Sequence, residues 1–152
     1  MADPFDPRLI AAGEQFTRTL QYTDDDIALI ARLTGDTNPL HVDPAFAERA
    51  RFGQVIASGQ HTAAQLMGLM ATHFSRGDDG VSRQMLCLNM NFSFKSPVYA
   101  KQPITLSWRV ANVTSNAKLQ GLVGQLDGHA TLAPGSPAVI ARGTILVTAG
   151  AA

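Results

Sequence analysis

The amino-acid sequence predicts an α+β domain in which an antiparallel sheet packs against helices. Helix-like patterns fill much of the first half of the 152-residue chain, whereas the second half holds long alternating runs separated by turn signals. No break in composition and no long Pro, Ser or Gly linker divides the chain. We therefore expect one domain over residues 1–152, large enough to bury a core.

The first two elements follow from local patterns near the N-terminus. Residues 14–20 (EQFTRTL) alternate polar and apolar side chains, which is typical of a half-buried strand. Thr23 is a candidate N-cap, because three aspartates follow it in the first turn, where the helix dipole favours anions. Apolar residues then recur at helical spacing up to Gly35, so an amphipathic helix is expected over about 24–33.

Two further helices are predicted before the sheet. Asp43-Pro44 has the form of an N-cap followed by proline at the first helical position, which indicates a short helix over 45–50. Ser58-Gly59 precedes a longer stretch, over about 60–74, whose residues are mostly apolar or small. Few of its positions suit full exposure to solvent, so we expect a central, buried helix.

The rest of the chain predicts an antiparallel meander. After a turn at 76–80, alternation along a long strand would place five apolar residues on one face: Leu86, Leu88, Met90, Phe92 and Phe94. Strands are also expected at 102–113, 118–131 and 138–148, because Asn/Ser and Pro/Gly turn signals separate them. The single cysteine, Cys87, cannot form an intramolecular disulfide, and its apolar surroundings predict a buried structural thiol.

The charge balance argues against a polyanionic partner. Lys plus Arg number 12 and Asp plus Glu number 12, so the net charge is zero and no strong field attracts nucleic acid or an anionic membrane. The N-terminal residues lack the basic stretch and apolar core of a signal peptide, and no apolar run approaches membrane-spanning length. We therefore expect a soluble, cytoplasmic protein.

One short segment concentrates residues that can do chemistry. Asp36, Asn38 and His41 place a carboxylate, an amide and an imidazole on backbone that is not expected to be regular helix, because it contains Gly35 and Pro39. A carboxylate and an imidazole can share one water, one group taking a proton and the other returning one, while an amide orients the carboxylate or the water. The same residues can instead be a turn acid, an Asx-turn residue and a satisfied histidine, so the pattern leaves both interpretations open.

Gly59 is a second candidate, because it stands at the mouth of the buried helix, where the first N–H groups lack intrahelical partners. A carbonyl oxygen docked there would have its developing negative charge stabilised by the N–H and the helix dipole, as an enolate-like transition state beside a thioester requires. The structural alternative is that Ser58 caps the helix and Gly59 packs tightly. We interpret His61 mainly as structural or pocket-lining.

Metal and cofactor motifs are weak or missing in the sequence. One histidine and one nearby aspartate supply too few ligands, and His61, His73 and His129 show no paired metal-binding spacing. The chain also contains no phosphate-binding GxxxxGK and no dinucleotide fingerprint. We therefore expect chemistry without a metal or a bound cofactor.

Residues 35–41 (GDTNPLH) resemble the Gly-Asp-x-Asn-Pro-hydrophobic-His signature of the MaoC-like dehydratase and (R)-specific enoyl-CoA hydratase family. The likeness continues through 42–47, 52–53 and 56–59 and, weakly, 91–98, so it covers most of the chain. It implies a hot-dog fold, in which an antiparallel sheet wraps a long central helix, usually in a homodimer. It also assigns roles to the candidate residues: Asp36 and His41 would activate water, Asn38 would orient it, and Gly59 would be the oxyanion donor.

The reaction that this resemblance implies is reversible hydration of a trans-2-enoyl-CoA to an (R)-3-hydroxyacyl-CoA, with CoA as part of a small-molecule substrate. Many relatives have histidine where this chain has Ser58, so acyl chain length and substrate preference do not follow from the likeness. A hot-dog acyl-CoA thioesterase would use similar residues but send water to the thioester carbonyl. A non-catalytic acyl-thioester binding subunit is the third interpretation, because a fold alone does not fix activity.

Overall fold

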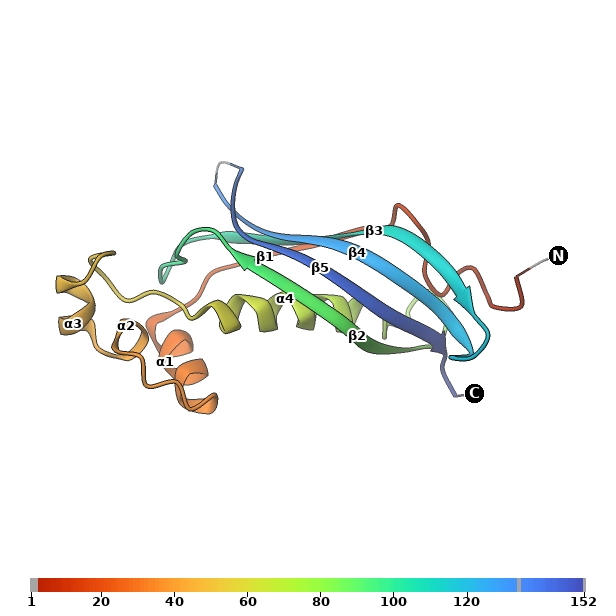
Figure 1. Ribbon diagram of the computed structural model, residues 1–152, viewed down its shortest axis with the longest axis horizontal. Helices are drawn as coiled ribbons and strands as arrows, with labels where there is room; N and C mark the ends of the chain where they lie inside the picture. Colours follow the sequence, from red (N-terminus) through yellow and green to blue (C-terminus); the bar gives the residue numbers. More distant parts are fainter. Residues whose placement is uncertain (1–2, 134, 152) are drawn as a thin grey trace.

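The computed structural model describes residues 3–133 and 135–151. In this part of the chain the elements follow the order expected from the sequence, with helices between the first strand and the remaining strands (Figure 1). Their bounds are β1 (Gln15–Leu20), α1 (Asp24–Leu33), α2 (Pro39–Val42), α3 (Pro44–Arg49), α4 (Gly59–His73), β2 (Arg83–Phe94), β3 (Ile104–Asn116), β4 (Gly121–Leu132) and β5 (Ser136–Ala149). Pro134, which stands between β4 and β5 in the sequence, lies outside the described residues.

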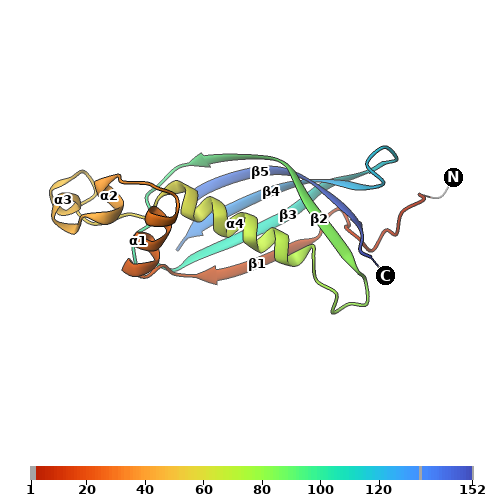
Figure 2. The same cartoon turned by 90° about the horizontal axis from the view of Figure 1, so that it is seen from below.

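The strands form one antiparallel sheet in the order β1-β3-β4-β5-β2, and α4 lies along one of its faces (Figure 2). Trp108 on β3 is fully buried there, and its indole N–H donates to the Leu66 carbonyl of α4 at 2.8 Å. Gly128 is its register partner on β4, and a Cβ at that position would lie 2.5 Å from the indole ring. Glycine at position 128 therefore leaves the space that the Trp108 ring occupies between the sheet and α4. The predicted α+β architecture is confirmed.

Side-chain caps determine where α1 and α3, two of the helices before α4, begin. The Thr23 side chain accepts from the backbone N–H of Asp26, whose carboxylate accepts from the backbone N–H of Thr23, so α1 begins with a capping box. Asp43 caps α3 by accepting from the backbone N–H of Phe46. Both predicted helix starts are confirmed. Figures 1 and 2 show α1, α2 and α3 gathered at one end of the sheet, near the start of α4.

The long helix α4 is buried on one side only. Leu66 and Met70 are fully buried against the sheet, as expected. Three small residues spaced about one turn apart are exposed on the other side: Ala64, Gly68 and Ala71. The prediction of a central helix is therefore confirmed, but the expectation that it is buried all round is wrong for a single copy of the chain.

Strand β2 departs from the alternation that the sequence suggested. Its register against β5 shifts where a β-bulge adds Leu88 without a partner. Because a one-residue insertion reverses the facing of everything beyond it, Leu86 points to the face opposite Met90 and Phe92. The expectation of one shared apolar face along residues 86–94 is therefore wrong.

Strand β2 is also one of the two edge strands of the sheet, the other being β1, so one of its edges has no neighbouring strand among the described residues. Cys87 is exposed, and the expectation of a buried thiol is wrong. The apolar pattern around the cysteine could not reveal that its strand lies at an edge. Three large apolar side chains of β2 are also well exposed, namely Leu86 at 63%, Leu88 at 47% and Phe94 at 55%.

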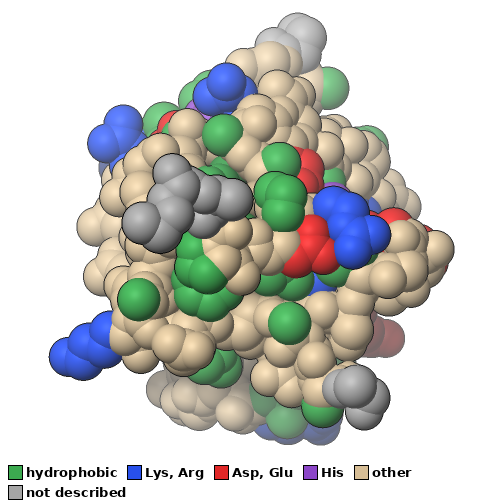
Figure 3. All heavy atoms as spheres, turned by 90° about the vertical axis from the view of Figure 1, so that its right-hand side faces the viewer, with side chains coloured by type: hydrophobic (Ala, Val, Ile, Leu, Met, Phe, Trp, Pro, Cys, Tyr) green, Lys and Arg blue, Asp and Glu red, His purple; other side chains and the backbone are tan. Residues whose placement is uncertain are grey.

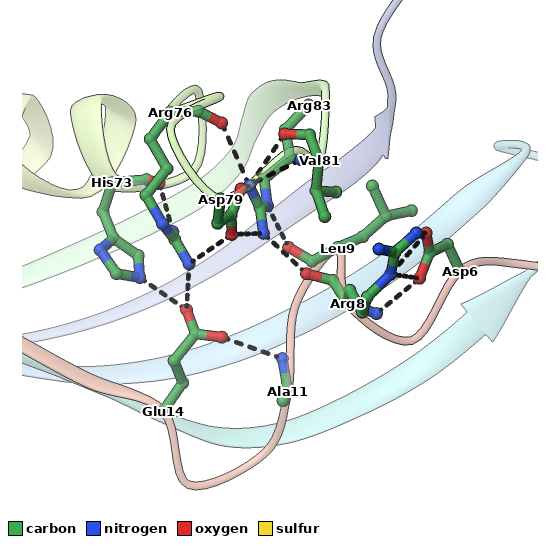
Figure 4. Close-up of polar contacts among 10 residues, drawn as sticks. All are labelled: Asp6, Arg8, Leu9, Ala11, Glu14, His73, Arg76, Asp79, Val81 and Arg83. Carbon is green, nitrogen blue, oxygen red and sulfur yellow. Dashed lines mark hydrogen bonds and ion pairs between the residues drawn. The ribbon is translucent and has the colours of Figure 1, made fainter.

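Near the C-terminal end of α4, a buried arginine at the start of β2 contacts the N-terminal segment (Figure 4). The side chain of Arg83 is 1% exposed, and its Nη2 lies 2.6 Å from a carboxylate oxygen of Asp79. It also donates to the backbone carbonyls of Arg8 at 2.8 Å, Leu9 at 3.0 Å and Val81 at 3.0 Å. We call these five residues the Arg83 clamp. Hydrogen bonding to the guanidinium holds the pKa of Asp79 well below its usual range.

A second polar contact lies beside the Arg83 clamp. His73, the last residue of α4, meets a Glu14 carboxylate oxygen through Nε2 at 2.6 Å and stacks on Phe16 with ring centroids 3.8 Å apart. Figure 3 looks onto this end of the molecule, where acidic and basic side chains lie next to one another at the surface.

Among the described residues no helix combines the length and apolar character that crossing a bilayer requires.

Candidate active site

The backbone brings Asp36, Asn38 and His41 together through two helix ends. Helix α1 stops at the C-cap Thr34, and Gly35 adopts a φ of 68°, a left-handed conformation that glycine accepts without strain. Asn38 then caps the short helix α2, its side chain accepting from the N–H two residues ahead. The sequence interpretation missed α2, which places His41 on helical backbone close to Asp36.

The three side chains converge at hydrogen-bonding or near hydrogen-bonding distances. His41 Nε2 lies 3.8 Å from Asp36 Oδ2 and 3.5 Å from Asn38 Nδ2. The backbone N–H of Asn38 donates to Asp36 Oδ1 at 3.0 Å. The side chain of His41 is 9% exposed and that of Asp36 is 24% exposed, so both are shielded yet accessible from one side. Both residues line the same pocket, and the 3.8 Å separation is compatible with one water contacting Asp36 Oδ2 and His41 Nε2 together.

The tautomer of His41 follows from its other ring nitrogen. Nδ1 lies 2.6 Å from the backbone carbonyl oxygen of Ile56. A carbonyl only accepts hydrogen bonds, so Nδ1 carries a proton, and in the neutral tautomer of the ring the free lone pair is on Nε2, which faces Asp36 and Asn38. The nitrogen that faces the carboxylate is therefore the basic one.

Gln60 is a site residue that the sequence interpretation missed. Its side-chain Nε2 donates to Asp36 Oδ2 at 3.2 Å and to Thr34 Oγ1 at 2.9 Å. No local pattern could have identified it, because it meets Asp36 across 24 residues of chain. Its only signal was its place directly after Gly59.

All four predicted site residues, Asp36, Asn38, His41 and Gly59, line one pocket of about 570 Å³, a volume typical of small-molecule sites. Apolar residues make up much of the remaining wall, among them Phe52, Ile56, Phe94 and Val98. The pocket therefore offers polar groups at one place and an apolar surface around them.

The N-terminus of α4 opens into this pocket at Gly59. This residue is exposed, and a Cβ added to it would lie 2.8 Å from the ring of Phe94. The side chain of Ser58 makes no capping bond, contrary to the structural alternative, and its buried Oγ has no hydrogen-bond partner among the described residues. The backbone N–H groups at the helix start are thus not covered by a side-chain cap.

Beside the pocket, α4 is anchored by buried polar side chains. Tyr22 donates to or accepts from Thr62 at 2.9 Å, and its ring stacks on His61 at a centroid distance of 3.8 Å. Burial raises the pKa of Tyr22 to about 12 and lowers the pKa of His61. His61 does not line the pocket that holds Asp36; it lines a separate, smaller pocket together with Tyr22 and Asp26.

A metal centre would require a different set of side chains. No cluster of three or more His, Cys, Asp or Glu residues is arranged to hold a metal ion within residues 3–133 and 135–151. The expectation of chemistry without a metal or a bound cofactor stays a prediction.

Comparison with known proteins places the chain in a family. The sequence profile described as "MaoC like domain" matches residues 9–129, which is most of the chain. The chain belongs to this family. Its members include hydratases and dehydratases, and the resemblance seen at residues 35–41 of this MaoC-like protein is confirmed.

Individual relatives of the MaoC-like protein are distant in sequence. The (R)-specific enoyl-CoA hydratase of Aeromonas caviae is 26% identical over 117 residues, which cover 77% of this chain and 83% of the relative. A mitochondrial 3-hydroxyacyl-[acyl-carrier-protein] dehydratase of Solanum lycopersicum is 29% identical over 91 residues, which cover 60% of this chain and only 50% of the relative. The R-hydratase structure from Pseudomonas aeruginosa superposes with a TM-score of 0.79 at 20% identity, covering 93% of this chain and 84% of that one. This structural likeness confirms the hot-dog fold.

Proposed function

We propose that this protein catalyses the reversible hydration of a trans-2-enoyl-CoA to an (R)-3-hydroxyacyl-CoA. The observation that carries the proposal is the pair of Asp36 Oδ2 and His41 Nε2, 3.8 Å apart at the wall of a pocket into which the start of α4 opens. Such a pair can hold and deprotonate one water, while the open helix start can receive the thioester oxygen. CoA enters this proposal as part of the substrate.

The tautomer of His41 suggests how protons move. A water between the two side chains gives one hydrogen bond to His41 Nε2 and the other to the Asp36 carboxylate. As the water oxygen bonds to C3 of the enoyl group, His41 takes a proton and the C2=C3 π electrons shift toward the thioester carbonyl. The resulting imidazolium is stabilised by Asp36 and returns its proton to C2, which completes the addition of one water.

The developing enolate needs a hydrogen-bond donor at the carbonyl oxygen. In this proposal the N–H of Gly59 supplies it; the role is supported by its position at the N-terminus of a 15-residue helix that has no side-chain cap. The helix dipole adds partial positive charge at the same place. Asn38, which approaches His41 Nε2 through its amide, would orient the water or the imidazole.

The activity is tested directly with pure protein and a panel of trans-2-enoyl-CoA substrates. Loss of the conjugated-thioester absorbance, followed by identification of an (R)-3-hydroxyacyl product, is the expected result. Release of free CoA without a hydroxyacyl product would instead favour a thioesterase and contradict the proposal.

Replacement of Gly59 by alanine separates the oxyanion role from a packing role. We expect the rate constant of hydration to fall about 10-fold or more, because the added Cβ blocks the carbonyl and displaces the donor. The melting temperature should change little, since the nearest atoms to the added Cβ belong to the ring of Phe94, a side chain that is 55% exposed. Hydration kinetics and thermal unfolding measure the two effects.

A double variant serves as the control for Gly59. If the loss arose from the contact with Phe94 alone, adding Phe94→Leu to Gly59→Ala would restore the rate. A destabilised Gly59→Ala protein whose folded fraction hydrates substrate at the wild-type rate would exclude the oxyanion role.

We also propose that the protein works as a homodimer in which the edge of β2 meets a second copy. Its exposed Leu86 and Leu88 and its unpaired edge would be costly to leave in water. The exposed small residues of α4, Ala64, Gly68 and Ala71, leave room for a second copy to approach the helix closely. A twofold-symmetric pairing would cover both features.

The dimer predicts a specific effect of charge on β2. Leu88→Arg should convert a dimer into a monomer at micromolar concentration, as measured by light scattering. Leu119→Arg, at a similarly exposed leucine in the turn before β4, is the control and should remain dimeric. A wild-type protein that is already monomeric under these conditions would contradict the proposal.

A further inference from the structure

The Asp36 carboxylate is held by two donors, one on each oxygen. Oδ1 accepts from the backbone N–H of Asn38 at 3.0 Å, and Oδ2 accepts from the side chain of Gln60 at 3.2 Å. A carboxylate fixed at one oxygen only can still rotate about the bond to its Cβ. The second donor removes this freedom and fixes the oxygen that faces His41 Nε2.

The orientation of the Gln60 amide follows from its neighbours. Thr34 Oγ1 donates its own proton to the backbone carbonyl of Ile30 at 2.8 Å, so it can only accept from Gln60. The carboxylate of Asp36 likewise accepts. Both contacts therefore require the amide NH₂ of Gln60, whose two N–H groups match the two acceptors at 2.9 and 3.2 Å.

This chain of hydrogen bonds links three separate parts of the fold. It begins at the C-terminal carbonyls of α1, passes through Thr34 at the C-cap, and crosses to the second residue of α4. From Gln60 it reaches the carboxylate of Asp36, in the segment between α1 and α2. The start of α4, which presents Gly59, and the Asp36–His41 pair are thereby held in one arrangement.

We infer that Gln60 is a positioning residue for the proposed hydration: its side-chain amide aims Asp36 Oδ2 at the water shared with His41. The inference rests on the proposed function. Gln60 lies on the pocket wall but need not touch the reacting atoms, because it acts through Asp36. Loss of this donor should affect the chemical step more than substrate binding, because a misaimed carboxylate misplaces the water.

The first experiment removes the donor without changing side-chain length. Gln60→Met should lower kcat for enoyl-CoA hydration about 10-fold, with KM and the melting temperature nearly unchanged. Thr34→Val, which removes the hydroxyl that accepts from Gln60 and donates to the Ile30 carbonyl, should cause a smaller loss in kcat. Gln65→Met, on the same helix but outside the pocket, is the matched control and should behave as wild type. Wild-type kcat in Gln60→Met would overturn the inference.

A charge variant adds a second measurement, the pH dependence of kcat, which would not change if Gln60 had only a structural role. In Gln60→Glu a second carboxyl group stands beside Asp36, and two neighbouring carboxylates hold a proton more readily than one. The acid limb of the pH dependence of kcat should therefore move to higher pH. His41, whose Nε2 lies 3.8 Å from Asp36 Oδ2, is retained in this variant, and the added carboxylate also favours its charged form, which moves the limb in the same direction. An acid limb at the same pH in both proteins would contradict the contact between the side chains of residues 60 and 36.

The hydrogen bond can also be tested without substrate, which separates this inference from the proposed function. In NMR spectra of the wild-type protein, the side-chain amide resonances of Gln60 should shift as Asp36 is protonated. The shift should vanish in Asp36→Asn, which has no carboxylate. If the protein hydrates no enoyl thioester, the proposed function fails while these spectra still decide the contact. If the resonances do not respond to Asp36, the inference fails even when hydration is observed.

Discussion

Asp36→Asn and His41→Ala are each expected to lower the turnover of enoyl-CoA hydration by about 100-fold or more. Asn at position 36 keeps the shape of the side chain but cannot stabilise an imidazolium, and alanine at position 41 removes the base whose Nε2 lies 3.8 Å from the carboxylate. Steady-state hydration kinetics measure both losses.

Two control variants show whether such losses are specific to the pocket. Asp43→Asn changes a nearby carboxylate that only caps α3, and asparagine caps helices equally well. His129→Ala removes an exposed histidine of β4 that does not line the pocket. Both should retain wild-type turnover. Near-wild-type hydration by folded Asp36→Asn or His41→Ala would show that the pair does not handle the protons.

The second large effect concerns stability at the opposite end of α4. Arg83→Met should lower the free energy of unfolding by about 3 kcal/mol or more, because the carbonyls of Arg8, Leu9 and Val81 would lose a buried donor. Arg142→Met is the matched control: its side chain is 83% exposed and lies 3.4 Å from Asp127. An exposed ion pair contributes at most about 1 kcal/mol, so this variant should be nearly as stable as wild type. Denaturant titration measures both variants.

The Arg83 clamp also predicts how the free energy of unfolding depends on pH in the acidic range. The pKa of Asp79 is lowered in the folded protein, so its contribution to stability is present above the ordinary aspartate pKa and is lost as pH falls below it. Wild type should therefore lose stability in this acidic range more steeply than Arg83→Met, in which Asp79 has no such partner. Equal slopes for the two proteins would argue against the pairing of Asp79 with Arg83.

The features that the sequence predicted correctly are those encoded by neighbouring residues. Thr23 and Asp26 mark the start of α1 within four positions, and the segment that contains Asp36, Asn38 and His41 is short enough for its members to meet locally. Because helix caps and turn signals act over a few residues, they can be recognised without knowledge of the fold.

What the sequence could not predict depends on residues far apart in the chain. Gln60 reaches Asp36 only because α4 begins beside the end of α1, and Arg83 reaches Leu9 across 74 residues. The exposure of Cys87 depends on β2 being the last strand of the sheet, and the facing of Leu86 depends on a single bulge. Alternation along a strand indicates its faces but neither its place in the sheet nor its register.

The hydrogen bond from His41 Nδ1 to the Ile56 carbonyl has a consequence for engineering the pocket. The acceptor belongs to the backbone, so exchanging the side chain at position 56 does not remove it. That side chain is itself part of the pocket wall. Residue 56 can therefore be varied among apolar amino acids to reshape the space for an acyl chain, while the imidazole keeps the proton on the same nitrogen.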